Sequence, residues 1–137
     1  MHEKLYKLFN KPDFGLLLMR VVIGIVMVSH GVPKFLSGKS ALENVGGAMA
    51  LLGVTTYPLF WGFMAAFAET IGGVLLVIGF YFRFVSFLLA FVTGLGAYML
   101  YTKGMDYQSM VSHPLSLCVV FLGLLFVGAG KYSIDKR

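Results

Sequence analysis

The chain has 137 residues, of which 58% are hydrophobic and only 12% are charged, and it carries 17 glycines in addition. A soluble domain carries about 25% charged residues, so this composition predicts a chain surrounded mostly by lipid and excludes intrinsic disorder, a coiled coil and a multi-domain enzyme. The net charge of +5 comes from lysines and arginines that flank the apolar runs, which indicates membrane topology rather than a nucleic-acid partner. The single cysteine, Cys118, excludes an internal disulfide or dithiol.

The first apolar run covers residues 14–35 and is long enough to cross a hydrocarbon core, which takes roughly 20 helical residues. Its length, together with Arg20 and His30 inside it, argues against a cleaved signal peptide. The stretch 41–52 that follows has apolar residues at helical intervals. It is predicted to be a short amphipathic helix on the outer interface, which caps the bundle or, alternatively, covers a binding site as a lid.

Three further runs, 57–81, 84–101 and 114–130, are also predicted to span the membrane. Only two residues separate the second and third spans, so these two form a tight antiparallel hairpin. Small residues at helical spacing on the second span allow a neighbouring backbone to approach closely. We therefore predict an all-α integral membrane bundle of four transmembrane helices, forming a single domain over residues 1–137.

An even number of spans places both chain ends on one side of the membrane. That side carries more basic residues than the other. The residues on the side of the chain ends are Lys4, Lys7, Lys11, Arg83, Lys131, Lys136 and Arg137. Those on the opposite side are Lys34, Lys39 and Lys103. Because loops rich in Lys and Arg remain in the cytoplasm, both termini are expected to be cytoplasmic.

Ionisable side chains inside the spans are candidate functional residues, because charge in the bilayer interior is costly. In the first span Arg20, His30 and Lys34 share one helical face, and Glu69 lies near the middle of the second span. We predict an ion pair between Arg20 and Glu69, with His30 in reach of Glu69. The structural alternatives are a pair that only fixes helix register, and snorkelling of Lys34 to the headgroups.

The remaining histidine near a span, His113, is interpreted as a cap residue before Pro114. The three histidines lie on separate segments and do not have the spacing of a metal site, so no metal is expected. No flavin or nucleotide motif is present either.

A series of short motifs runs through most of the chain. In order they are Arg20 with Gly24, His30-Gly31-x-x-Lys34-Phe35, Leu52-Gly53, Glu69-x-x-Gly72-Gly73-x-x-Leu76-x-x-Gly79, Arg83, and Gly128-Ala129-Gly130-Lys131-Tyr132-Ser133-Ile134-Asp135. Their order and spacing resemble the DoxX family of small bacterial membrane proteins, from about Phe14 to Asp135.

The resemblance implies a multi-pass protein of the bacterial cytoplasmic (inner) membrane that belongs to a redox or oxidative-stress system. A lipid-soluble quinone is the most economical redox partner, held by His30 or Lys34 near the outer interface or by Arg20 near the inner one, with Glu69 as proton acceptor. In that reading the candidate catalytic residues are Glu69 and His30, and soluble oxidoreductases are further partners. The alternative functions are a non-enzymatic carrier of a lipid or small anionic solute, which with four spans would require a homo-oligomer, and an assembly scaffold for partner oxidoreductases.

Overall fold

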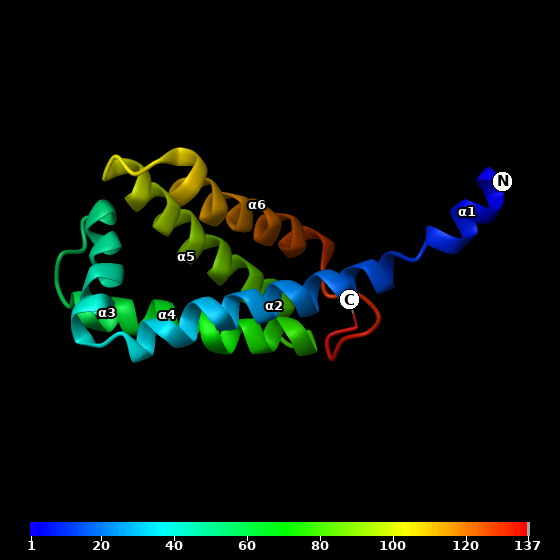
Figure 1. Cartoon of the computed structure of the whole chain (residues 1–137). Helices are drawn as coiled ribbons and strands as arrows, with labels where there is room; N and C mark the ends of the chain where they lie inside the picture. Colours follow the sequence, from blue (N-terminus) through cyan, green and yellow to red (C-terminus); the bar gives the residue numbers. More distant parts are fainter. Residues whose placement is uncertain (137) are drawn as a thin grey trace.

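The computed structural model describes residues 1–136, and Arg137, which the count of basic residues includes, lies outside the described residues. Within residues 1–136 the chain forms helices and no strands. In chain order the elements are α1 (His2–Phe9), α2 (Pro12–Leu36), α3 (Lys39–Gly46), the 3-10 helix η1 (Gly47–Leu52), α4 (Pro58–Ile78), α5 (Phe82–Thr102), the π-helical turn η2 (Tyr107–Val111) and α6 (Ser112–Val127) (Figure 1).

Four helical runs in the described part of the chain are long and apolar enough to cross a membrane: α2, α4, α5 and the continuous run Tyr107–Val127. This confirms the predicted all-α bundle of four transmembrane helices. Proline starts α2 and α4, where its missing N–H needs no partner. Gly79, with φ +72°, ends α4 in the left-handed conformation that glycine tolerates best.

Helices α2 and α4 pack antiparallel along small residues. A Cβ atom on Gly24 would lie 2.5 Å from the carbonyl oxygen of Gly73, and one on Gly31 would lie 2.9 Å from the carbonyl oxygen of Ala66. No larger side chain fits there without displacing backbone, so these glycines let the two helices touch, as the small residues of the second span predict. The same contacts fix which residues of the two helices lie level with each other.

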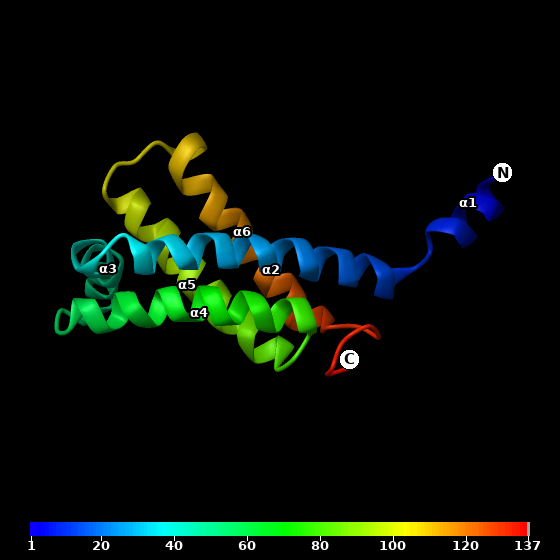
Figure 2. The ribbon, with the colours of Figure 1, turned by 60° about the horizontal axis from the view of Figure 1, so that its bottom comes forward.

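The second pair of helices is α5 with α6, and the two pairs diverge from a common end. They share a buried core near the α4–α5 turn, which includes Leu76, Phe82 and Phe121. Figures 1 and 2 show the pairs close together at this end and splayed at the other, where α3 lies across the ends of α2 and α4. One end of the bundle is therefore closed by side-chain packing and the other is hollow.

Candidate functional site: a polar niche in an apolar cavity

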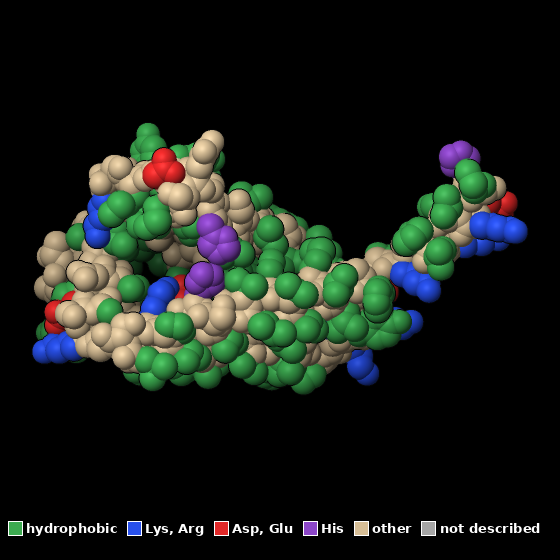
Figure 3. Space-filling model, in the orientation of Figure 1, with side chains coloured by type: hydrophobic (Ala, Val, Ile, Leu, Met, Phe, Trp, Pro, Cys, Tyr) green, Lys and Arg blue, Asp and Glu red, His purple; other side chains and the backbone are tan. Residues whose placement is uncertain are grey.

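A cavity of about 1170 Å³ lies between the two helix pairs and extends from the splayed end to Tyr81 and Phe84 beside the α4–α5 turn. Its wall is mostly apolar and is contributed by all four spans and by α3 and η1. The polar side chains on this wall are His30, Lys34, Trp61, Glu69, Tyr81, Thr93 and His113. Figure 3 shows two histidines in contact and a basic side chain beside the hollow. We refer to His30, Lys34, Glu69 and His113 as the polar niche.

The centre of the polar niche is an ion pair between Lys34 on α2 and Glu69 on α4. The Lys34 Nζ atom lies 2.7 Å from each carboxylate oxygen of Glu69. The Glu69 side chain is 6% exposed and the Lys34 side chain 29%, so the pair is mostly shielded from solvent. Pairing with a cation at hydrogen-bond distance reduces the cost of keeping a carboxylate inside a bilayer.

Glu69 does not pair with Arg20, and the predicted Arg20–Glu69 ion pair is wrong. The Cα–Cβ bonds of a helix tilt toward its N-terminus. Arg20 therefore reaches toward the start of α2 and away from Glu69. Lys34 and Glu69 lie on antiparallel helices, so each leans toward the other. The prediction from depth alone ignored this direction.

Arg20 instead caps the end of α4, at the closed end of the bundle. Its side chain is fully buried. Nη1 donates to the carbonyl oxygens of Leu76 at 3.3 Å and Val77 at 3.1 Å, and Nη2 donates to the carbonyl oxygen of Tyr132. The Leu76 and Val77 carbonyls belong to the last turn of α4, where the negative end of the helix dipole favours a cation. Arg20 is not among the residues that line the cavity.

The segment after α6 completes this closed end. The Asp135 carboxylate accepts hydrogen bonds from the backbone N–H groups of Tyr81 at 3.2 Å and Phe82 at 2.7 Å, and so caps the start of α5. The N–H of Lys131 donates to Asp13 at the start of α2, at 3.0 Å. The last of the recognised motifs therefore holds α2, α4 and α5 together rather than lining the cavity.

His30 on α2 and His113 on α6 meet across the cavity mouth. Their Nε2 atoms are 3.2 Å apart and their ring centroids 5.3 Å apart. A hydrogen bond at this distance needs Nε2–H on one ring and a bare Nε2 on the other, so the accepting ring carries its hydrogen on Nδ1. The pair therefore accommodates one extra proton on the donor ring but not two, because two would set Nε2–H groups against each other.

His113 lies inside α6, which starts at Ser112 and has no side-chain cap, so its interpretation as a cap residue is wrong. Nothing in the spacing of His30 and His113 along the chain signals their contact, because it depends on how α2 and α6 are placed in space. Within residues 1–136, no group of three or more His, Cys, Asp and Glu side chains is positioned to hold a metal ion.

Trp61 on α4 contributes an unused hydrogen-bond donor to the cavity wall. Its Nε1–H is buried and has no partner among the described residues. A buried donor without an acceptor costs free energy.

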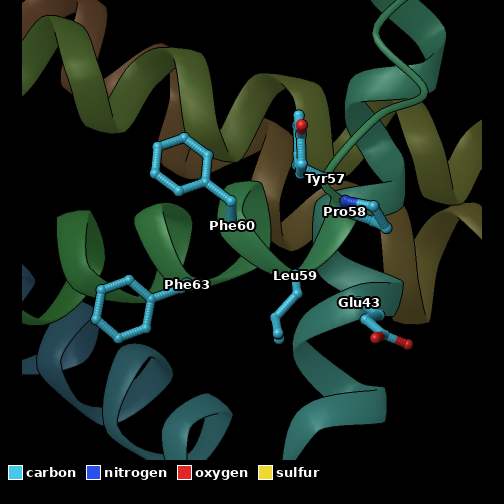
Figure 4. A pocket seen from close by; sticks show the side chains of 6 residues that line it. All are labelled: Glu43, Tyr57, Pro58, Leu59, Phe60 and Phe63. Atoms are coloured by element: carbon cyan, nitrogen blue, oxygen red, sulfur yellow. The ribbon is translucent and has the colours of Figure 1, made fainter.

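A smaller pocket of about 470 Å³ lies where α4 begins, beside α3. Glu43, Tyr57, Pro58, Leu59, Phe60 and Phe63 line it. Figure 4 shows these side chains spread along the surface of two helices rather than converging on one point. This pocket therefore has less of the character of a binding site than the cavity between the helix pairs.

Comparison with known proteins agrees with the resemblance seen in the motifs. The DoxX family model matches residues 15–102. The protein named "Putative oxidoreductase CatD" of Bacillus subtilis is 28% identical over 123 residues, which cover 90% of this chain and 86% of that protein. An uncharacterized protein of Haemophilus influenzae is 25% identical over 132 residues, covering 93% of this chain and 92% of that one. No solved structure gives a significant match.

Proposed function

This chain belongs to the DoxX family, and from that premise we propose that it is the quinone-binding membrane component of a redox system. The observation that carries the proposal is the cavity, which joins an apolar wall to a niche holding an ion pair and two histidines. Its volume of about 1170 Å³ is somewhat larger than that of most ligand pockets, which span roughly 300–1,000 Å³.

The cavity fits the chemistry of a quinone, which is a flat apolar ring with two carbonyl acceptors. An ammonium group has three N–H donors, and Glu69 accepts from Lys34 at 2.7 Å through both of its oxygens. One Lys34 donor is thus left for a ligand carbonyl. An isoprenoid tail would lie along the apolar wall, between the splayed helix pairs.

The niche also holds protons next to the proposed ligand. A quinone takes up two electrons and two protons on reduction, and this chain, with one cysteine, has no dithiol to supply the electrons. We therefore assign the electrons to a partner oxidoreductase. In this proposal the His30–His113 pair holds a proton at the mouth of the cavity, and Glu69 accepts one inside it. The protein acts in the bacterial cytoplasmic membrane with both chain ends in the cytoplasm.

Fluorescence of Trp61 offers a direct test, since it is the single tryptophan of the chain and lines the cavity. The protein in nanodiscs is titrated with a short-chain ubiquinone, which quenches indole fluorescence on close approach. Saturable quenching is expected. Lys34→Gln and Glu69→Gln should weaken it roughly 10- to 100-fold, because a hydrogen bond to a charged group contributes about 1.5–3 kcal/mol.

Glu43→Gln is the matched control, because Glu43 is the glutamate on α3 and is not among the residues lining this cavity. Its quenching curve should superimpose on that of the unaltered protein. Quenching that does not saturate would sink the proposal. So would saturable quenching with equal affinity in the Lys34, Glu69 and Glu43 variants, each shown to be folded by its circular dichroism.

A further inference from the structure

Helix α1 stands clear of the bundle and has no buried residue. Figures 1 and 2 show it projecting beyond the start of α2, away from the other helices. Only Asn10 and Lys11 separate it from α2. With 8 residues, α1 is too short to span a membrane.

The helix is amphipathic. At 100° per residue, Leu5, Leu8 and Phe9 share one face, Lys7 and Glu3 lie on the opposite one, and Lys4 lies at the edge of the apolar face beside Leu8. The apolar side chains are 45%, 58% and 75% exposed, respectively. A face with this much uncovered apolar surface is expected to be buried against something outside the described chain.

An outside surface is also needed for α1 to persist as a helix. Isolated helices shorter than about 12–15 residues are marginal in water, and α1 has 8 residues. Its one ion pair, Lys7 to Glu3 at 3.2 Å, joins two side chains that are 74% and 81% exposed. Such a pair contributes a few tenths of a kcal/mol. The helix therefore depends on a partner for its stability.

We propose that α1 lies on the membrane surface at this end of the bundle and recognises anionic lipid headgroups. The membrane is the surface within reach of α1, because the membrane-spanning helix α2 begins at Pro12, directly after the two-residue link. Residues 2–11 carry Lys4, Lys7 and Lys11 against Glu3, a formal charge of 3 − 1 = +2. A helix with an apolar face and lysines outside it is suited to the boundary between headgroups and acyl chains.

The lysines supply the headgroup preference. Each lysine near an anionic leaflet raises the ratio of membrane-bound to free α1 roughly fivefold. Three lysines together raise that ratio on the order of 100-fold. This term is screened by salt, since the Debye length falls from about 10 Å at 0.1 M to about 3 Å at 1 M. The burial of Leu8 and Phe9 does not depend on salt or headgroup in this way.

Hydrogen–deuterium exchange of the intact protein tests the proposal. The protein is placed in nanodiscs of phosphatidylcholine alone or mixed with phosphatidylglycerol, and exchange of the α1 amides is followed by mass spectrometry. Exchange should be at least tenfold slower with phosphatidylglycerol, and 1 M salt should largely remove the difference. The triple variant Lys4→Gln, Lys7→Gln, Lys11→Gln should exchange alike in both lipids.

The matched control is Lys39→Gln with Lys103→Gln, which removes two exposed lysines at the other end of the bundle. It should retain the lipid dependence of the unaltered protein. Equal α1 exchange in both lipids overturns the proposal without any variant being made. Protection gained only when a soluble oxidoreductase is added, and not with phosphatidylglycerol, would likewise overturn it in favour of a protein partner.

Discussion

Two arginines cap helix ends in this bundle in nearly the same way but in different surroundings. Arg20 Nη1 donates to two successive carbonyls at the end of α4, and Arg83 Nη1 donates to the carbonyl oxygens of Leu125 at 2.8 Å and Phe126 at 3.1 Å at the end of α6. Arg20 is fully buried, whereas Arg83 is exposed. The comparison isolates what burial adds to a helix-capping arginine.

Replacing Arg20 with leucine should cost about 3–4 kcal/mol of the free energy of unfolding. Hydrogen bonds to charged groups contribute about 1.5–3 kcal/mol each and are not additive, and each buried carbonyl left without a donor carries its own desolvation cost. Arg20 makes three such bonds, including the one to the Tyr132 carbonyl that ties down the segment after α6. Arg83→Leu should cost about 1 kcal/mol or less, because water and headgroups reach the carbonyls that it leaves.

The measurement is unfolding of each variant by sodium dodecyl sulfate in dodecyl maltoside micelles, followed by far-ultraviolet circular dichroism. Under conditions in which Arg20→Lys remains folded, quinone quenching of Trp61 should retain its affinity, since Arg20 does not line the cavity. Two results would refute the reasoning. One is an Arg20→Leu variant no less stable than Arg83→Leu. The other is a folded Arg20→Lys variant that loses quinone affinity as Glu69→Gln is expected to.

Three other predictions address stability. Lys34→Met should destabilise by about 3 kcal/mol by leaving Glu69 unpaired, and Glu69→Leu in the same chain should restore most of the loss; additive losses in a double-mutant cycle would contradict this. Gly73→Ala should weaken the α2–α4 contact by about 1–3 kcal/mol, since its Cβ would lie 2.6 Å from a carbonyl oxygen, while Gly123→Ala, with open space around it, should have no measurable cost. Hydrogen bonds from Ser109 in η2 lower the pKa of Asp106, so its cap should be intact at neutral pH and be lost only as the pH falls through this lowered pKa. Asp106→Asn should remove the resulting acid-induced rise in amide exchange, and an unchanged acid response in that variant would count against the cap.

The membrane fold was predictable because hydropathy and span length depend on local sequence alone. The spans lie where the apolar runs are, and the small residues of α4 pack against glycines of α2 as their spacing indicates. The stretch 41–52, predicted as one amphipathic helix, is an α-helix (α3) up to Gly46 and a 3-10 helix (η1) from Gly47. The 3-10 turns and the π-helical η2 depend on packing that periodicity does not show.

The site was predictable only in part. Charge in the spans singled out Lys34 and Glu69, which the structure brings together as an ion pair, but counting depth from the span ends gave Glu69 the wrong partner. The level at which α2 and α4 meet is fixed by the Gly24–Gly73 contact, and a change of about one helical turn moves every pairing between the two helices. Side chains on a helix lean toward its N-terminus, and this direction, which follows from the sequence once the helices are assigned, favours Lys34 as the partner of Glu69.

The capping of α5 by Asp135 means that the α4–α5 turn is completed late during synthesis of the chain. The N–H groups of Tyr81 and Phe82 at the α4–α5 turn receive their acceptor from a residue 53–54 positions further along the chain. The hairpin therefore enters the bilayer with its turn unfinished, and its polar groups must remain hydrated until the ribosome has added α5, α6 and the segment after them. A fusion or affinity tag placed next to Asp135 would compete for this docking step, so expression of labelled protein should tolerate a tag before α1 better than one immediately after Asp135.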